Sequence, residues 1–181
     1  MASSMKLIIL NGPCGVGKST LAKALHTEMP LSFLVDIDVI NGFIADHEDD
    51  IDKEERWKIS KEVSKAILKT MLELGRDVIV DKMIYDDTLL NEYREIAESF
   101  SSEVFEIILW AEKAVVMARA SERGFLKSGR LTAESCELFW HKIDELKALR
   151  QEVEIIDSTW LTSEEVLKKV KNVLGKNSSE N

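Results

Sequence analysis

The stretch Gly12-Pro13-Cys14-Gly15-Val16-Gly17-Lys18-Ser19-Thr20 decides the fold of this chain. It follows the apolar run Leu7-Ile8-Ile9-Leu10 and leads into the helical pattern Leu21-Ala22-Lys23-Ala24-Leu25. The pattern G-x-x-x-x-G-K-[ST] between a strand and a helix is typical of a P-loop, a loop that binds phosphate groups. Its glycines let the backbone N–H groups point inward at a phosphate, and the helix that follows directs its positive dipole end at the same anion.

The residues of this loop have expected roles in the binding of ATP and Mg²⁺. We expect the backbone of residues 12–20 to surround the phosphates, with the ammonium of Lys18 at the β- and γ-phosphates and the hydroxyl of Ser19 on Mg²⁺. Cys14 lies inside the loop. We interpret Cys14 as a variable position without chemistry of its own, and the alternative is a reactive thiol that bound ATP would protect.

The length and charge of the chain restrict its class. Its 181 residues carry 24 Lys and Arg against 33 Asp and Glu, which gives a net charge of −9. Such an acidic chain disfavours a nucleic-acid partner, because it repels a phosphate backbone. No apolar run is long enough for a membrane span, so no membrane partner is expected. We expect one domain over residues 1–175, a disordered tail at residues 176–181, and a monomer or homodimer.

The cysteines and the N-terminus indicate the compartment. Cys14 and Cys136 are the whole cysteine content, and a single pair makes no disulfide framework. The first residues lack the layout of a signal peptide, because the short apolar run at residues 7–10 passes directly into the loop. We therefore expect a cytoplasmic protein in a reducing cytosol.

Short apolar runs alternate with longer amphipathic ones along the whole chain. Strands are predicted at Lys6–Leu10, Ser32–Asp36, Asp77–Asp81, Val104–Trp110 and Glu152–Ile156. Helices are predicted at Lys18–His26, Val39–Asp46, Lys53–Leu74, Asp86–Phe100, Lys113–Glu122, Thr132–Arg150 and Ser163–Leu174. In the third helix, Trp57, Val63, Ala66, Ile67, Met71 and Leu74 recur with the helical repeat. This alternation predicts an α/β fold of three layers, a parallel sheet with helices on both faces, and an active crevice at the carboxyl ends of the strands.

Three carboxylates fall at those carboxyl ends. Asp36 and Asp38 follow the second strand, and Asp81 closes the third. Beside a P-loop, one carboxylate can accept the proton of a substrate hydroxyl as that hydroxyl attacks the γ-phosphate, and another can support Mg²⁺. We favour Asp38 as the base and Asp81 or Asp36 as the support for the metal. The alternatives are that Asp38 caps the helix predicted to open at Val39 and that Asp81 is a solvated strand end.

Basic and polar residues late in the chain are candidates for nucleotide contacts. Arg119, Arg123 and Arg130 lie on a helix and on the glycine-punctuated stretch after it, which predicts a lid that closes over ATP. Single surface charges are the alternative. Ser158 and Thr159 follow the last strand, where a loop commonly lines the adenine pocket, although ordinary turn chemistry explains them equally well.

Four segments carry a family resemblance: residues 7–12 with the P-loop, 35–40, 76–81 and 154–159. They resemble P-loop small-molecule kinases, most closely chloramphenicol phosphotransferase-like proteins and next gluconate-kinase-like proteins. The resemblance covers almost the whole domain and implies a P-loop NTPase fold with five parallel strands in the order 2-3-1-4-5. It also implies Asp38 as the general base, and Arg123 and Arg130 as lid arginines. Such enzymes hold their acceptor in the region that corresponds to residues 42–57. This region has no sequence pattern that matches a site for chloramphenicol or for a sugar acid.

These observations predict an ATP-dependent phosphotransferase that acts on a hydroxyl of a small molecule, such as an antibiotic, a sugar acid or a similar metabolite. Lys18, Asp38, Arg123 and Arg130 are the expected catalytic residues. A nucleotide-binding regulatory ATPase module that acts through a protein partner is the alternative, and a kinase for nucleic-acid ends is a third, which the charge disfavours.

Overall fold

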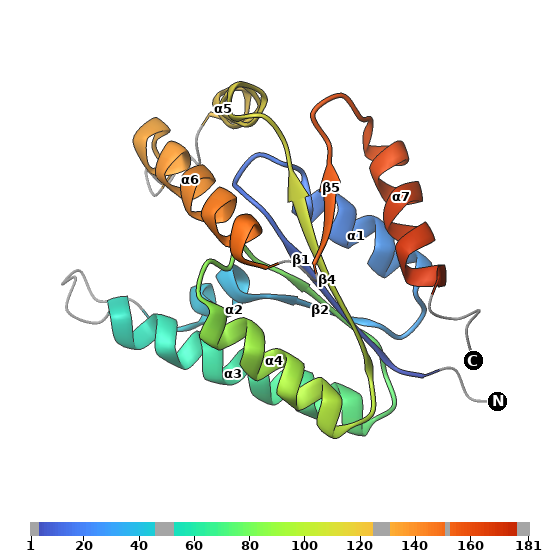
Figure 1. The fold of residues 1–181 in the computed structure, drawn as a ribbon. Coiled ribbons are helices and arrows are strands. Elements are labelled where there is room, and N and C mark those ends of the chain that lie inside the picture. The colour runs from blue at the N-terminus through green and yellow to red at the C-terminus, as the bar shows by residue number, and fades with distance from the viewer. Residues whose placement is uncertain (1–3, 46–52, 125–130, 151–152, 177–181) are drawn as a thin grey trace.

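The apolar run before the loop forms strand β1 (Lys6–Asn11), which lies at the centre of a parallel sheet of five strands. The computed structural model describes residues 4–45, 53–124, 131–150 and 153–176. The other strands are β2 (Phe33–Asp36), β3 (Val78–Asp81), β4 (Glu103–Trp110) and β5 (Glu154–Asp157). Their order in the sheet is β2-β3-β1-β4-β5, so the predicted P-loop NTPase fold is confirmed (Figure 1).

The register of the central strands brings the polar ends of the strands together. Leu10 of β1 pairs with Asp81 of β3, and Asp81 pairs in turn with Asp36 of β2. The side chains of residues 7–10 are fully buried, as expected for a strand covered on both faces. The carboxyl ends of β1, β2 and β3 therefore lie side by side at the edge of the sheet where the P-loop begins.

Helices cover both faces of the sheet. They are α1 (Lys18–Glu28), α2 (Ile37–Phe43), α3 (Lys53–Glu73), α4 (Asp87–Ser99), α5 (Lys113–Glu122), α6 (Ala133–Leu149) and α7 (Ser163–Lys176). One core cluster joins the sheet to α1, α5 and α7, and a second joins it to α3, α4 and the later part of α6. Figure 1 shows α1 and α7 on one side of the strands and α3 and α4 on the other.

Two predicted helix limits change in the structure. Helix α2 begins at Ile37 rather than at Val39, because the Asp36 carboxylate accepts hydrogen bonds from the backbone N–H groups of Asp38 and Val39 at 2.9 and 3.2 Å and so caps the helix. Lys176, predicted to open a disordered tail, is the last residue of α7. Residues 177–181 lie outside the described residues.

The buried face of α3 differs from the predicted apolar face. The helix buries the stripe Arg56, Ser60, Ser64, Leu68 and Leu72. Val63 and Leu74, predicted to face the core, are 39% and 64% exposed. Polar side chains occupy the first half of the buried stripe because they form hydrogen bonds with side chains of α2 and α4, a pairing that apolar periodicity does not reveal.

None of the helices in the described parts of the chain combines enough length with enough apolar character to cross a bilayer.

Candidate functional site

The P-loop is fixed in shape by its glycines and by two neighbouring elements. Gly12, Gly15 and Gly17 have φ values of 141°, 82° and 106°, which side-chain-bearing residues rarely adopt. A Cβ atom on Gly12 would lie 2.2 Å from the carbonyl oxygen of Leu109, and one on Gly15 would lie 2.8 Å from that of Val116. The loop therefore lies directly against the end of β4 and against α5, and only glycine fits at these two positions.

Asn11 is a residue of the site that the sequence analysis missed. Its side chain is fully buried, and its Oδ1 accepts hydrogen bonds from the backbone N–H groups of Gly12 and Ile84 at 2.8 and 2.9 Å. Its Nδ2 donates to the carbonyl of Ile84 at 2.6 Å. Asn11 thus fastens the start of the P-loop to the segment after β3. A polar residue that ends an apolar strand directly before a loop glycine is the signal that could have revealed it.

The ammonium of Lys18 contacts the backbone of the P-loop. Its Nζ donates hydrogen bonds to the carbonyl oxygens of Gly12 and Pro13 at 2.8 and 2.9 Å. Burial lowers the pKa of Lys18 to about 8, and the nearby carboxylates of Asp81 and Asp38 offset only part of this effect. The charges of Lys18, Asp81 and Asp38 are thus close enough to act on one another, as expected for one site.

Ser19 and Asp81, two of the residues predicted to support Mg²⁺, lie next to each other. The buried carboxylate of Asp81 accepts a hydrogen bond from the Ser19 hydroxyl. Burial raises the pKa of Asp81, and the hydrogen bond from Ser19 and the charge of Lys18 oppose this rise. Asp36, the other candidate, uses its Oδ1 to cap α2.

The donors at this point fit Mg²⁺ only in combination with phosphate. Within the described parts of the chain, no group of three or more His, Cys, Asp or Glu side chains is arranged to hold a metal ion. A hydroxyl and a carboxylate, as in Ser19 and Asp81, match the oxygen ligands that Mg²⁺ prefers beside substrate phosphates. The observed pair therefore fits a magnesium ion that a nucleotide brings with it.

Asp38 forms an ion pair that the sequence analysis did not predict. Its carboxylate lies 2.5 Å from Nζ of Lys82, and the two side chains are 65% and 17% exposed. The same Nζ lies 4.3 Å from the centre of the Trp57 ring. The largely buried ammonium of Lys82 thus holds the exposed carboxylate of Asp38 in place. The alternative that Asp38 caps α2 is wrong, because Asp36 has that position.

The predicted arginines separate into two groups. The Arg123 guanidinium, at the end of α5, donates to the carbonyl oxygen of Gly15 in the P-loop at 3.3 Å. The Arg119 guanidinium donates instead to the carbonyls of Ser158 and Thr159 at 3.2 and 3.5 Å. Arg119 and the segment after β5 therefore contact each other one helical turn away from Arg123, and their role toward a nucleotide stays a prediction. Arg130 lies outside the described residues.

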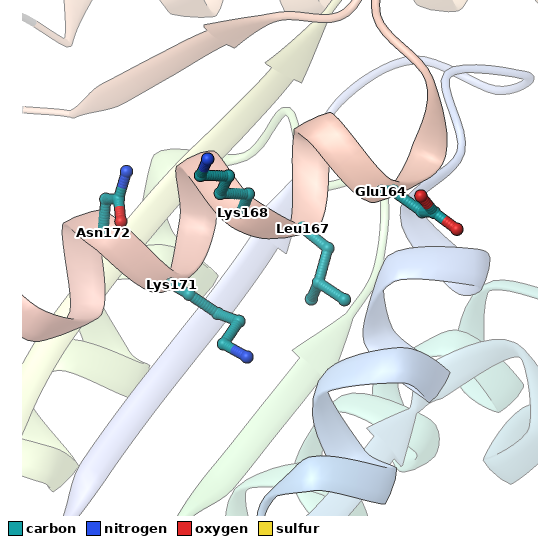
Figure 2. Close-up of a pocket in the computed structure, with 5 residues that line it drawn as sticks. All are labelled: Glu164, Leu167, Lys168, Lys171 and Asn172. Carbon is teal, nitrogen blue, oxygen red and sulfur yellow. The ribbon is translucent and has the colours of Figure 1, made fainter.

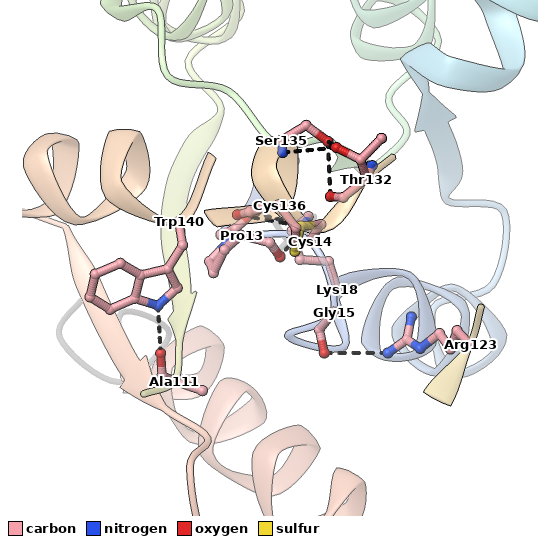
Figure 3. Close-up of a disulfide and its surroundings, with 11 residues drawn as sticks. Pro13, Cys14, Gly15, Lys18, Ala111, Arg123, Thr132, Ser135, Cys136 and Trp140 are labelled. Carbon is pink, nitrogen blue, oxygen red and sulfur yellow. Dashed lines mark hydrogen bonds between the residues drawn. A yellow bond between two sulfur atoms is a disulfide. The ribbon is translucent and has the colours of Figure 1, made fainter. Parts of the chain in front are cut away.

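The expectation for the cysteines is wrong. Cys14 of the P-loop and Cys136 of α6 form a disulfide, although 122 residues separate them (Figure 3). The fold produces this pairing, because α6 begins beside the loop at the carboxyl end of β1. A sequence separation of this size gives no sign of pairing, so the two residues had appeared unrelated.

Two surface hollows lie away from the phosphate loop. One lies along α7 and is lined by Glu164, Leu167, Lys168, Lys171 and Asn172 (Figure 2). The other lies between the segment after β3 and α6 and is lined by Tyr85, Asp87, Lys142, Glu145, Leu146 and Leu149. Neither hollow includes a residue of the P-loop, so the candidate site rests on the contacts described above.

Comparison with known sequences and structures agrees with this geometry. The profile of the AAA domain family AAA_33 matches residues 7–139, which include the P-loop, Asp38, Asp81 and Arg123. No curated protein sequence matches the chain. The match over most of the chain confirms the predicted resemblance to P-loop small-molecule kinases.

Three solved structures show the same fold at low sequence identity. The tunicamycin resistance protein of Deinococcus radiodurans is 17% identical, with a TM-score of 0.65 and coverage of 94% of this chain and 96% of that one. A sugar kinase from Janibacter sp. is 18% identical, with a TM-score of 0.63 and coverage of 96% and 95%. The APS kinase of Mycobacterium tuberculosis, solved with AMPPNP and APS, is 14% identical, with a TM-score of 0.62 and coverage of 96% and 99%.

Proposed function

We propose that this chain is a kinase that moves the γ-phosphoryl group of ATP to a hydroxyl of a small molecule. The chain belongs to the AAA_33 family of AAA domains, which supports this proposal. The observation that carries this proposal is the position of Lys18 on the P-loop, near enough to Asp81 and Asp38 for their charges to act on it. A cation and two carboxylates beside a ring of backbone amides are the parts that phosphoryl transfer requires.

On the nucleotide side, each group has one task. The loop amides and Lys18 hold the phosphates, and the Lys18 ammonium exchanges its bonds to the carbonyls of Gly12 and Pro13 for bonds to phosphate oxygens. Ser19 and Asp81 would hold Mg²⁺, which neutralises charge on the phosphates when it is bound. Arg123, which donates to the carbonyl of Gly15, is proposed to contact the transferred group, and Arg130 is proposed as its partner from the family resemblance. Arg119, Ser158 and Thr159 would line the base of the nucleotide.

On the acceptor side, Asp38 is proposed as the general base. It takes the proton of the acceptor hydroxyl, the hydroxyl oxygen forms a bond to the γ-phosphorus, and the bond to the β-phosphate oxygen breaks to release ADP. Lys82 is a positioning residue, because its ammonium holds the Asp38 carboxylate at 2.5 Å and rests on the Trp57 ring. The exposed position of Asp38 leaves a face of the carboxylate open to the acceptor.

The acceptor and the compartment follow from more general properties. A net charge of −9 favours a small-molecule acceptor over a nucleic acid. The use of ATP favours the cytoplasm, where a disulfide is typically transient or redox-sensing rather than structural.

Transfer from ATP labelled at the γ-phosphate to a panel of hydroxylated antibiotics, sugar acids and related metabolites tests the proposal. We expect one class of acceptor to become labelled, and Lys18→Met to abolish labelling because it removes the cation at the phosphates; Lys23→Met, on the same helix, is the matched control. Release of labelled phosphate that no acceptor increases would favour a regulatory ATPase module. Labelling by Lys18→Met at the wild-type rate would contradict the assignment of the site.

A further inference from the structure

The disulfide joins the phosphate loop to a helix that is distant in sequence. Cys14 lies between Pro13 and Gly15, and Cys136 lies in the first turn of α6. Their Cα atoms are 6.2 Å apart, within the range that a disulfide bridges. Figure 3 shows the bond between them, and they are the only two cysteines in the sequence. The single disulfide that the chain can form thus falls inside its nucleotide site.

The start of α6 is a firm anchor for this bond. Thr132 and Ser135 form a capping box, in which each side chain accepts a hydrogen bond from the backbone N–H of the other at 3.2 and 2.8 Å. One turn after Cys136, the indole of Trp140 donates to the carbonyl oxygen of Ala111, just after β4, at 2.9 Å. These hydrogen bonds hold Cys136 in place relative to the sheet independently of the disulfide.

The loop is held from outside at two consecutive residues. Cys14 is bonded to α6, and the carbonyl of Gly15 accepts a hydrogen bond from Arg123 at the end of α5. The hydrogen bond can open quickly, but the covalent bond cannot open without a chemical reaction. Of these two restraints, only the disulfide therefore needs a chemical step before Cys14 can move away from α6.

The two sulfurs differ in accessibility. Cys136 is fully buried in the core cluster that contains α1 and α5, whereas Cys14 is only partly buried. Thiol–disulfide exchange requires a thiolate to reach one sulfur in line with the bond that breaks. Because Cys14 is the less buried of the two residues, we expect an external thiol to attack its Sγ, and the sulfur of Cys136 is then the leaving group.

We propose that Cys14–Cys136 is a thiol–disulfide exchange site that controls the rate at which nucleotide enters and leaves the P-loop. A dithiol reductant gives two electrons and two protons, its own sulfurs form a disulfide, and Cys14 and Cys136 become thiols. A disulfide oxidant of the glutathione type reverses the reaction. In the bonded state the loop stays against α6 and nucleotide exchange is slow; in the dithiol state the loop moves and exchange is fast. The inference requires nucleotide binding by the loop but not phosphoryl transfer.

Release of a fluorescent ADP analogue from the full-length protein tests this inference. The dissociation rate is measured by stopped flow after oxidation with diamide and after reduction with dithiothreitol, and thiols are counted in denaturant to confirm each state. We expect reduction to raise the rate by roughly 5–150-fold, the usual range for coupling between two sites. Cys136→Ser, which keeps Cys14, is expected to release the analogue at the fast rate in both conditions.

The outcomes separate this inference from the proposed function. Equal rates in the two states of the wild-type protein, with thiol counts of zero and two, would overturn the exchange site and leave the kinase proposal standing. Absence of analogue binding in both states would overturn both. The wild-type comparison needs no substitution, so it decides the question even if Cys136→Ser fails to fold.

Discussion

The parts of the candidate site that we propose for the nucleotide and for the acceptor, called the nucleotide half and the acceptor half below, are built in different ways. The nucleotide half consists of backbone groups within one short stretch, residues 12–20, whose shape comes from glycines. The acceptor half consists of side chains from separate elements, such as Asp38 of α2 and Lys82 after β3. A contiguous motif can be read from the sequence, whereas side chains that meet only after folding cannot.

Helix packing in the acceptor half is polar where the rest of the core is apolar. The guanidinium of Arg56 donates to the carbonyl and to the side-chain oxygen of Asn41 at 3.0 and 3.2 Å, and the Asn41 amide donates to the Ser60 hydroxyl at 3.0 Å. All three side chains are buried. These directional bonds fix the end of α2 against α3 and so fix the helix that carries Asp38.

Replacement of Asp38 by asparagine gives the sharpest separation of the two halves. The amide cannot accept the proton of the acceptor hydroxyl, so kcat for transfer is expected to fall by roughly 10²–10⁴-fold. The dissociation constant for ATP is expected to stay at the wild-type value, since the P-loop is untouched. Calorimetry for binding and the labelled-transfer assay for turnover check the two expectations. Asp87→Asn, at another exposed carboxylate, is the matched control, and an unchanged kcat in Asp38→Asn would remove Asp38 from the mechanism.

Glycine-to-alanine substitutions compare how well the P-loop and helix α2 tolerate an added Cβ atom. Gly12→Ala introduces a Cβ atom 2.2 Å from the Leu109 carbonyl at a φ of 141°, so the free energy of unfolding is expected to fall by about 3 kcal/mol. Gly42→Ala, within α2, meets nothing within 4 Å and is expected to raise the free energy of unfolding by about 0.5–1 kcal/mol. Urea denaturation measures both. Equal effects at the two positions would contradict the contrast between a strained loop and an ordinary helix.

The ionisation of Tyr93 is expected to make a smaller, pH-dependent contribution to the free energy of unfolding. Its buried hydroxyl bonds to the Ser64 hydroxyl at 2.6 Å, and burial raises the pKa of Tyr93 from 10.0 to about 12. Below pH 10 the residue is protonated in both states. Between pH 10 and 12 the unfolded chain loses the proton and the folded chain keeps it, so this contribution to the free energy of unfolding, roughly 2–3 kcal/mol, is lost as pH rises.

Urea denaturation from pH 9 to pH 12 measures this loss. Tyr93→Phe is expected to show a shallower decline than the wild-type protein, because the variant has no proton to lose at this position. Tyr85→Phe, at an exposed tyrosine, is the matched control and is expected to retain the wild-type decline. Identical declines in wild type and Tyr93→Phe would show that the hydroxyl does not titrate as assigned.

The sequence predicts the fold almost completely and locates the P-loop, but it does not predict the side chains that hold the loop in place. Apolar runs that alternate with amphipathic ones locate every strand and helix to within a few residues, and the glycine spacing locates the loop. The motif says nothing about α6, so the pairing of Cys14 with Cys136 was missed. The buried face of α3 was misjudged for a related reason, since Ser60 and Ser64 are buried through partners that no local pattern reveals.

The central place of β1 has a consequence for the order in which the protein is made. The strand that leads into the P-loop pairs with β3 and β4, whose residues come about 70 and 100 positions later. A nascent chain that has left the ribosome only as far as α3 therefore has no partner for β1 and no shaped cradle for phosphate. Nucleotide in the cell can therefore stabilise this protein only after β4 has been synthesised. Binding then stabilises a nearly complete domain and does not stabilise shorter N-terminal fragments.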